Sequence, residues 1–340
     1  MYMKYIFTLL LSLPVCYANA QEQTAKLLQE TAKTLLQKGD YDNAVTLLEK
    51  AKLQEPDNIE ILKDLCFTNY LKRDFSKAIE VGKNMIEKLN ADEQSFQMLG
   101  LAYKAIASYK DCAKLYKVAL KRFPNSGVLY NEAAELAAIE KNMDEAITLW
   151  EKGIESDPGH SNNYYNASIY YARKNNWIRC ILYSEIFLNL ESYTKRAEDI
   201  KDQLFTAYNN LLSPGAVQQA TDAKTTSTFE KSVLETLGKA TGTAKSRYSI
   251  SDLISIRTKF MVDWMQGKQK TYPFQLFTQE QYLLSQGLFE AYNYWLFSAP
   301  SSSAMYEAWQ KDHAKETDGY KAFQQSRVFK LPAGEYYFAR

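Results

Sequence analysis

The chain has 340 residues with 41 Lys or Arg and 40 Asp or Glu, so its formal net charge is only +1. This balance, together with the absence of a long basic run, argues against nucleic acid as the main partner, because phosphate binding rests on clustered Lys and Arg. Beyond the N-terminal region no uncharged apolar stretch is long enough to span a bilayer, so we expect no integral membrane segment in the mature chain.

The N-terminus has the three parts of a secretory signal. Lys4 is the basic part, residues 6–13 form an apolar stretch too short to cross a bilayer, and small residues surround the expected cleavage site after Ala20. We therefore interpret residues 1–20 as a signal peptide and expect an exported protein, periplasmic or secreted, in a bacterial envelope. A lipid anchor on Cys16 is the alternative, although a valine precedes this cysteine where Gly, Ala or Ser is normal.

Small residues then return every 34 positions in two series, without an insertion or deletion. One series is Ala44, Ala78, Cys112, Ala146 and Cys180, and the other is Ala32, Cys66, Gly100, Ala134 and Ser168. A third series at the same spacing carries helix-stopping or turn residues, at Pro56, Asn90, Pro124, Pro158 and Ser192. A small side chain at a crossing lets two antiparallel helices approach closely. The spacing therefore predicts a row of helical hairpins.

This pattern resembles the tetratricopeptide repeat (TPR), a helix-turn-helix unit that stacks into a solenoid. The clearest copy has Phe96, Leu99, Gly100 and Tyr103 on its first helix, then Tyr109, Cys112, Tyr116, Ala119 and Pro124. The resemblance implies an all-α fold with a right-handed TPR-type solenoid of five repeats over residues 25–194. Turn and capping residues stand between the paired helices, as at Gly39-Asp40 and Asn175-Asn176.

The C-terminal third shows no family resemblance. We interpret residues 195–212 as a capping helix, because a solenoid must cover the exposed face of its last repeat, and residues 213–228 as a linker by composition. Residues 229–340 are predicted to form a mainly helical, aromatic-rich domain. Its expected helices are 229–239, 251–266, 278–297 and 303–313, followed by a small hairpin of 328–331 and 336–338.

Within this domain, regular helical spacing predicts a core made by Tyr282, Phe289, Tyr292, Trp295 and Leu296. Further aromatic residues lie near one end of the domain, at Tyr294, Phe297, Tyr306 and Trp309. We interpret these as core packing too, with stacking on a sugar or peptide as the alternative.

The three cysteines after the signal peptide, Cys66, Cys112 and Cys180, stand in the small-residue series. A thiol can replace Ala there as a small buried group. Because helices of neighbouring repeats lie about 8 to 10 Å apart, beyond the reach of a disulfide, we predict free, buried thiols.

Residues that could carry catalysis or bind a metal are few. The chain has two histidines, of which His160 falls in a turn between repeats. His313, with Asp312 and Glu316, supplies at most half of a metal site, because distant histidines without a cysteine pair are a poor zinc set. Nucleophile-elbow, dinucleotide and phosphate-loop motifs are absent from the sequence. We therefore expect no enzyme activity, no cofactor and no bound metal.

The resemblance also implies where a partner binds, since first helices of successive repeats in this family line a concave groove. The corresponding positions are Lys63, Phe67, Tyr70, Gln97, Leu101, Lys104, Asn131, Glu135, Tyr165, Ile169 and Arg173. Their mixture of aromatic, aliphatic, amide and charged groups suits a protein or peptide partner. The alternative is the plain surface of a structural spacer.

A basic stripe on the second helix of the third repeat, made by Lys110, Lys114, Lys117 and Lys121, is interpreted as a solvated outer face, with an anionic partner as the alternative. Taken together, the sequence predicts an exported, non-catalytic protein-interaction scaffold. The alternative function is a glycan- or peptide-binding, or even hydrolytic, protein whose site lies in the C-terminal domain.

Overall fold

The computed structural model describes residues 24–299 and 302–338, so the expected signal peptide and its cleavage site lie outside the described residues. The regular secondary structure of the described residues is all helical, without a strand among them, which confirms the predicted all-α class. In this part of the chain no helix has the length and apolar character needed to cross a membrane. The chain divides into two compact units, Met1–Glu140 and Lys141–Arg340, a boundary inside the fourth predicted repeat rather than at residues 213–228.

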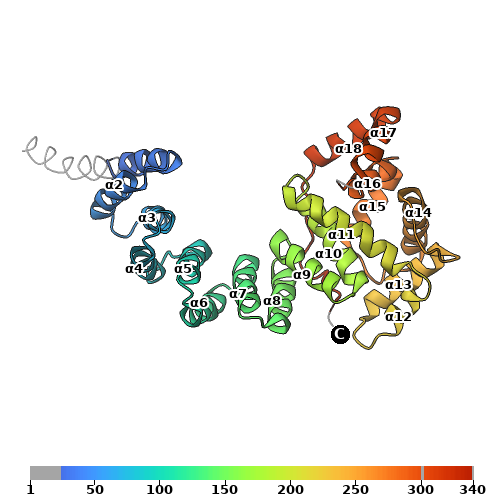
Figure 1. The fold of residues 1–340 in the computed structure, drawn as a ribbon, viewed down its shortest axis with the longest axis horizontal. Coiled ribbons are helices and arrows are strands. Elements are labelled where there is room, and N and C mark those ends of the chain that lie inside the picture. The colour runs from blue at the N-terminus through green and yellow to red at the C-terminus, as the bar shows by residue number, and fades with distance from the viewer. Residues whose placement is uncertain (1–23, 300–301, 339–340) are drawn as a thin grey trace, which may run out of the picture. The chain divides into compact units, whose positions relative to one another are not determined.

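The first unit is a series of antiparallel helix pairs (Figure 1). After helical residues 24–37 come α2 (Tyr41–Gln54), α3 (Ile59–Leu71), α4 (Phe75–Ile86), α5 (Glu93–Ala105), α6 (Tyr109–Arg122) and α7 (Gly127–Ile139). Each helix packs against the next, and the first helices α3, α5 and α7 also contact one another in turn. The first unit therefore presents a continuous surface built from α3, α5 and α7.

Turn chemistry repeats along both units with the period of 34 residues. Two residues before each second helix begins, the backbone is left-handed, with φ between 54° and 77°, at Gly39, Arg73, Ala107, Lys141 and Asn175. The next residue is the N-cap of that helix: Asp40, Asp74, Ser108, Asn142 and Asn176. Four of these five side chains accept a bond from a backbone N–H three residues on, which satisfies a donor of the first helical turn.

The two small-residue series lie where paired helices touch. Cys66 Sγ donates to the carbonyl of Ala78 at 3.3 Å, and Cys112 Sγ lies 3.6 Å from the carbonyl of Gly100, so the two series face each other. A Cβ placed on Gly100 would come within 2.0 Å of the Tyr116 hydroxyl oxygen. All three described cysteines are free and buried, as predicted. Burial raises the pKa of the Cys66 thiol to about 12.

The second unit begins with helices of the fourth and fifth repeats and continues into the C-terminal region (Figure 1). Its helices are α8 (Met143–Ser156), α9 (Ser161–Arg173), α10 (Trp177–Leu190), α11 (Lys195–Leu211), α12 (Ala216–Asp222), α13 (Thr228–Thr241), α14 (Ile250–Gly267), α15 (Gln275–Ser285), α16 (Phe289–Leu296), α17 (Ser303–Asp312) and α18 (Ala314–Ser326). Residues 178–188 of α10 are all buried. A helix covered on every side belongs to a core, so α10 is the centre of this unit.

Although α11 matches the span predicted for a capping helix, it does not end the helical stack. It packs against α9 and α10, and its Phe205 and Tyr208 rings also meet Phe297 edge-on at 5.9 and 5.7 Å. Lys201 Nζ lies 4.4 Å from the centroid of the Trp295 ring. The C-terminal helices therefore cover the last repeat, whereas a cap presents a polar outer face to water.

Three details of the C-terminal region differ from prediction. Residues 213–228 contain α12, which packs against α13, so this segment is not a plain linker. The single helix expected at 278–297 is two helices, because Gly287 has φ +69° and ends α15. Helix α18 was not predicted at all.

The predicted C-terminal hairpin is also wrong, since residues 327–338 run without strands. Instead, the Phe338 ring is buried between Tyr183 at 4.9 Å and Phe229 at 5.6 Å. Residues 327–338 are therefore an extended segment that packs against other helices, and we call this segment the C-terminal strap.

A buried polar cluster joins α10 to α14 and α15. The Arg257 guanidinium donates to both carboxylate oxygens of Glu185, at 2.9 Å for one, and to Glu280 at 2.6 Å. The Tyr208 hydroxyl donates to Glu185 at 2.6 Å. Burial and the neighbouring Glu185 raise the pKa of Glu280 well above its usual range, while Arg257 lowers the pKa of Glu185 in spite of burial. We therefore expect the two carboxyl groups beside this guanidinium to titrate apart, Glu185 below and Glu280 above the usual range.

Candidate functional site

The structure places the predicted partner positions of the first unit on α3, α5 and α7. Several of the polar ones bond to side chains of the same helix or at the start of the next first helix instead of standing free. Lys63, only 4% exposed, donates to Asp92 at 2.5 Å and to Glu60 at 2.9 Å. Asn131 donates to Glu135 at 3.0 Å on the same helix. These groups are therefore already held in fixed positions.

A residue that the sequence analysis missed organises this surface. Glu132, 5% exposed, accepts hydrogen bonds from Gln97 at 2.7 Å, Lys104 at 2.6 Å and the Tyr116 hydroxyl at 3.1 Å. The sequence could have indicated Glu132, because Gln97 and Glu132 lie 35 residues apart and the pair Gln29 and Asp64 has the same spacing. Gln29 also donates a hydrogen bond to Asp64, at 2.5 Å. Glu132 thus ties α5 and α6 to α7.

Between these fixed polar groups lie apolar side chains that remain partly exposed. Phe67 and Tyr70 stack with their ring centroids 6.5 Å apart, and Leu101 is half-buried on the next first helix. Apolar groups on a surface of this kind are where a partner's side chains gain most binding energy.

The predicted positions on α9 behave differently. The Tyr165 ring packs against Phe187 at 5.2 Å and lies under the Arg196 guanidinium, 4.8 Å from the ring centroid. Ile169 is half-buried and Arg173 is exposed. The structure therefore covers Tyr165 with residues of α10 and the start of α11.

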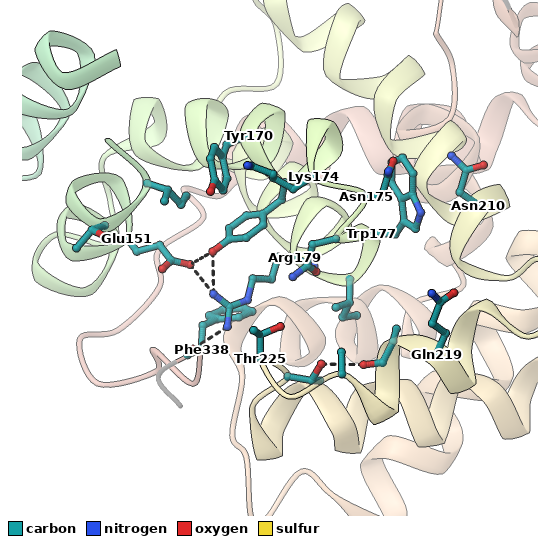
Figure 2. Close-up of a pocket in the computed structure, with 18 of the residues that line it drawn as sticks. Glu151, Tyr170, Lys174, Asn175, Trp177, Arg179, Asn210, Gln219, Thr225 and Phe338 are labelled. Carbon is teal, nitrogen blue, oxygen red and sulfur yellow. Dashed lines mark hydrogen bonds and ion pairs between the residues drawn. The ribbon is translucent and has the colours of Figure 1, made fainter. Parts of the chain in front are cut away.

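The second unit also contains a large cavity that the sequence analysis did not anticipate. Its volume is about 1210 Å³, and its walls come from α8, the turn between α9 and α10, the end of α11, helix α12 with the turn after it, and the C-terminal strap (Figure 2). We call it the Arg179 cleft, after the side chain at its centre. Its lining includes none of the predicted partner positions.

Arg179 uses all its donors to hold this cleft together. Nε and Nη2 donate to the two oxygens of Glu230 at 2.7 and 3.1 Å, and Nη2 also donates to the carbonyl of Phe338 at 3.0 Å. Nη1 donates to Glu151 and to the Tyr171 hydroxyl, each at 2.8 Å. A guanidinium has five N–H groups, so none is left for a ligand. Its role here is structural.

The rim of the cleft is aromatic and polar. Tyr170, Lys174 and Trp177 lie beside the turn between α9 and α10, and Asn210 and Gln219 belong to α11 and α12 (Figure 2). Lys174 Nζ lies 5.6 Å from the centroid of the Tyr170 ring. The amides of Asn210 and Gln219 make no side-chain hydrogen bond within the described residues. They can therefore turn toward a bound molecule.

At the aromatic end of the C-terminal domain, the Trp309 ring is covered by its neighbours. Trp309 is stacked on both faces, by Tyr294 at 4.4 Å and by His313 at 4.5 Å, and is 8% exposed. The alternative in which Trp309 stacks on a sugar is therefore wrong, and the expectation of core packing holds for this ring. In the predicted core, Tyr292 is fully buried but Tyr282 is 41% exposed, so Tyr282 does not belong to it.

Comparison with known proteins agrees with the helical-hairpin pattern. Residues 92–197 match the family model for Iml2/Tetratricopeptide repeat protein 39. No curated protein has a sequence that matches this chain.

Several solved structures are similar to this chain at low sequence identity. A tetratricopeptide repeat protein from Parabacteroides merdae is 15% identical over 81% of this chain and 98% of that one, with a TM-score of 0.42. PilF of Pseudomonas aeruginosa is 11% identical over 59% and 90%, with a TM-score of 0.47. YrrB, described as a TPR protein with an unusual peptide-binding site, is 19% identical over 52% and 90%, with a TM-score of 0.37.

Proposed function

Because this chain is a tetratricopeptide-repeat protein, we propose that it is an exported, non-catalytic scaffold that holds a segment of a partner protein against α3, α5 and α7. The observation that carries the proposal is the surface of the first unit. Phe67, Tyr70 and Leu101 remain partly exposed there, between polar side chains that are already fixed. This arrangement supplies apolar anchors with hydrogen-bonding groups around them.

Fixed polar groups favour binding because they are already ordered. Ordering a long side chain on binding costs about 0.5 to 1.5 kcal/mol. Lys104 avoids most of this cost, since it is held by Glu132 at 2.6 Å in the unbound protein. A partner segment therefore meets a surface whose shape changes little on association.

Export is the second part of the proposal and rests on the signal-like N-terminus. Protein recovered from a bacterial host should begin at Gln21 when its N-terminus is sequenced. A mature protein that keeps Met1 would contradict export by this route.

A phage-displayed peptide library selected on the purified mature chain tests the binding surface. The selected peptides should bind the double variant Phe67→Ala, Leu101→Ala about tenfold more weakly or worse, because truncating central anchors removes most of their contribution. Leu53→Ala is the matched control, since Leu53 is 83% exposed on the second helix α2. Circular dichroism confirms that each variant is folded.

Two results would count against the proposed surface. One is a library that yields no binding peptide. The other is a set of peptides whose Kd is the same for the double variant and for the wild-type chain.

A further inference from the structure

We infer that the Arg179 cleft is a second binding site and that its ligand is a neutral oligosaccharide. The cleft belongs to the second unit, and its lining is separate from α3, α5 and α7. The inference therefore stands independently of the proposed scaffold function.

The size of the cleft favours an oligomeric ligand. Pockets for single small molecules usually have volumes of about 300 to 1,000 Å³. The cleft has about 1210 Å³ and is open along walls formed by segments far apart in the sequence. A chain of a few linked units fills such a space better than a single small molecule does.

Apart from Lys174, whose Nζ lies over the Tyr170 ring, the charged side chains that line the cleft are paired with one another or with Glu230, which disfavours an ionic ligand. Arg179 spends its donors on Glu230, Glu151 and neighbouring oxygens. Lys152 pairs with Glu155 at 2.7 Å on the same helix. An anionic ligand would have to compete for these groups and leave a buried carboxylate without its partner, at a large cost. A ligand without charge meets no such penalty.

The uncommitted groups match sugar hydroxyls. The side-chain amides of Asn175, Asn210 and Gln219 make no hydrogen bond to other described residues. Each amide offers both donors and an acceptor, as a hydroxyl does. The half-buried indole of Trp177 adds an apolar face with a single N–H, against which the C–H face of a sugar ring can lie.

The opposite wall explains why a peptide is the weaker choice. The wall formed by α12 and the turn after it contributes Ala216, Ala220 and Ala223, whose small side chains give a peptide no large apolar group to pack against on this side. Peptide recognition depends on a few large side chains that enter apolar recesses. A wall of small residues next to amides without a protein partner in the described part of the chain suits a row of sugar rings better.

A microarray of neutral oligosaccharides, three to eight units long and of gluco, manno, galacto and xylo configuration, tests the inference on the full mature chain. We expect at least one of them to bind, with the Kd then measured by calorimetry. Trp177→Ala and Gln219→Ala should each weaken that binding by about tenfold, because they remove the stacking face and a hydrogen-bonding amide. Tyr193→Ala is the matched aromatic control, since Tyr193 is 73% exposed and outside the cleft.

Trp177→Phe keeps the test valid if the alanine variant does not fold, because it retains a ring and should retain part of the affinity. Binding of no array member overturns the inference. Unchanged binding by the folded Trp177 variants also overturns it. So does a selected peptide that depends on Trp177 when no oligosaccharide does, because the cleft would then be a peptide site. None of these results affects the test of α3, α5 and α7.

Discussion

The substitution Gly100→Ala tests the claim that small residues let the paired helices touch. A Cβ at this position would lie 2.0 Å from Tyr116 Oη, 2.5 Å from Cζ and 2.9 Å from Cε1, whereas ordinary contact begins at 3.4 Å. The ring must therefore move by about 1.4 Å, yet it is 1% exposed and donates a hydrogen bond to Glu132 at 3.1 Å.

The expected change in the free energy of unfolding combines three effects. Overpacking of this kind costs about 1 to 3 kcal/mol. Loss of the Tyr116 to Glu132 hydrogen bond adds about 1 kcal/mol. The higher helix propensity of Ala returns about 1 kcal/mol at position 100. We therefore expect Gly100→Ala to lower the free energy of unfolding by about 1 to 3 kcal/mol.

Urea denaturation followed by circular dichroism measures this difference, and the background variant Tyr116→Ala supplies the control. With the ring removed, the added methyl group has space, so Gly100→Ala should stabilise the Tyr116→Ala protein by up to about 1 kcal/mol. The change of sign between backgrounds identifies the contact. An equal effect in both backgrounds, or no loss in the wild-type chain, would refute the reasoning.

Two further predictions concern backbone strain and a buried proton. Ala107→Gly should raise the free energy of unfolding by about 1 kcal/mol in urea titrations, because Ala107 has φ +54°, a backbone conformation that glycine adopts without strain. Ala113→Gly, on an exposed face of α6, is the control and should lower the free energy of unfolding by a similar amount. A change of the same sign in both variants would contradict the strain at Ala107. The pKa of Glu280 is raised in the folded protein, so the folded chain keeps a proton that the unfolded chain loses above a pH of about 4.3. The free energy of unfolding should therefore fall as the pH rises, by up to about 1.4 kcal/mol for each pH unit, until the pH reaches the pKa of Glu280 in the folded protein. Glu280→Gln removes that loss and should be more stable than the wild-type chain at pH 7, with a flatter dependence of Tm on pH; a less stable variant at pH 7 would contradict the protonated state.

The sequence was sufficient to predict the helical hairpins because their determinants are local and periodic. A small residue such as Ala78 and its facing partner Cys66 lie 12 residues apart, and the same pair of positions recurs in each repeat. The C-terminal region lacks this redundancy. Its central ion pair joins Glu185 to Arg257, which are 72 residues apart, and a periodic pattern cannot predict a contact of this kind.

The cleft was hidden from sequence reasoning for the same physical reason. In the sequence, Arg179 looks like any charged residue in the first turn of a repeat helix. The residues to which it donates hydrogen bonds belong to other elements. Phe338, whose carbonyl it bonds, is 159 residues away. The break at Gly287 was missed because apolar residues continue on both sides of it, so the pattern alone could not separate one helix from two.

The residues at equivalent positions of two repeats indicate which helix the C-terminal region packs on. The basic stripe of α6, Lys110, Lys114, Lys117 and Lys121, is exposed. The same repeat positions two repeats later, on α10, are Ile178, Leu182, Glu185 and Asn189.

Ile178, Leu182 and Glu185 are buried, and Asn189 accepts a hydrogen bond from Gln279 of α15 at 2.6 Å. Lysines on a water-facing stripe keep that face solvated, whereas apolar residues at the same places require a cover. The replacement of lysine by isoleucine and leucine in one register therefore marks α10 as the helix on which the C-terminal helices pack. The aromatic-rich domain follows from it, because only a large apolar partner can bury that face.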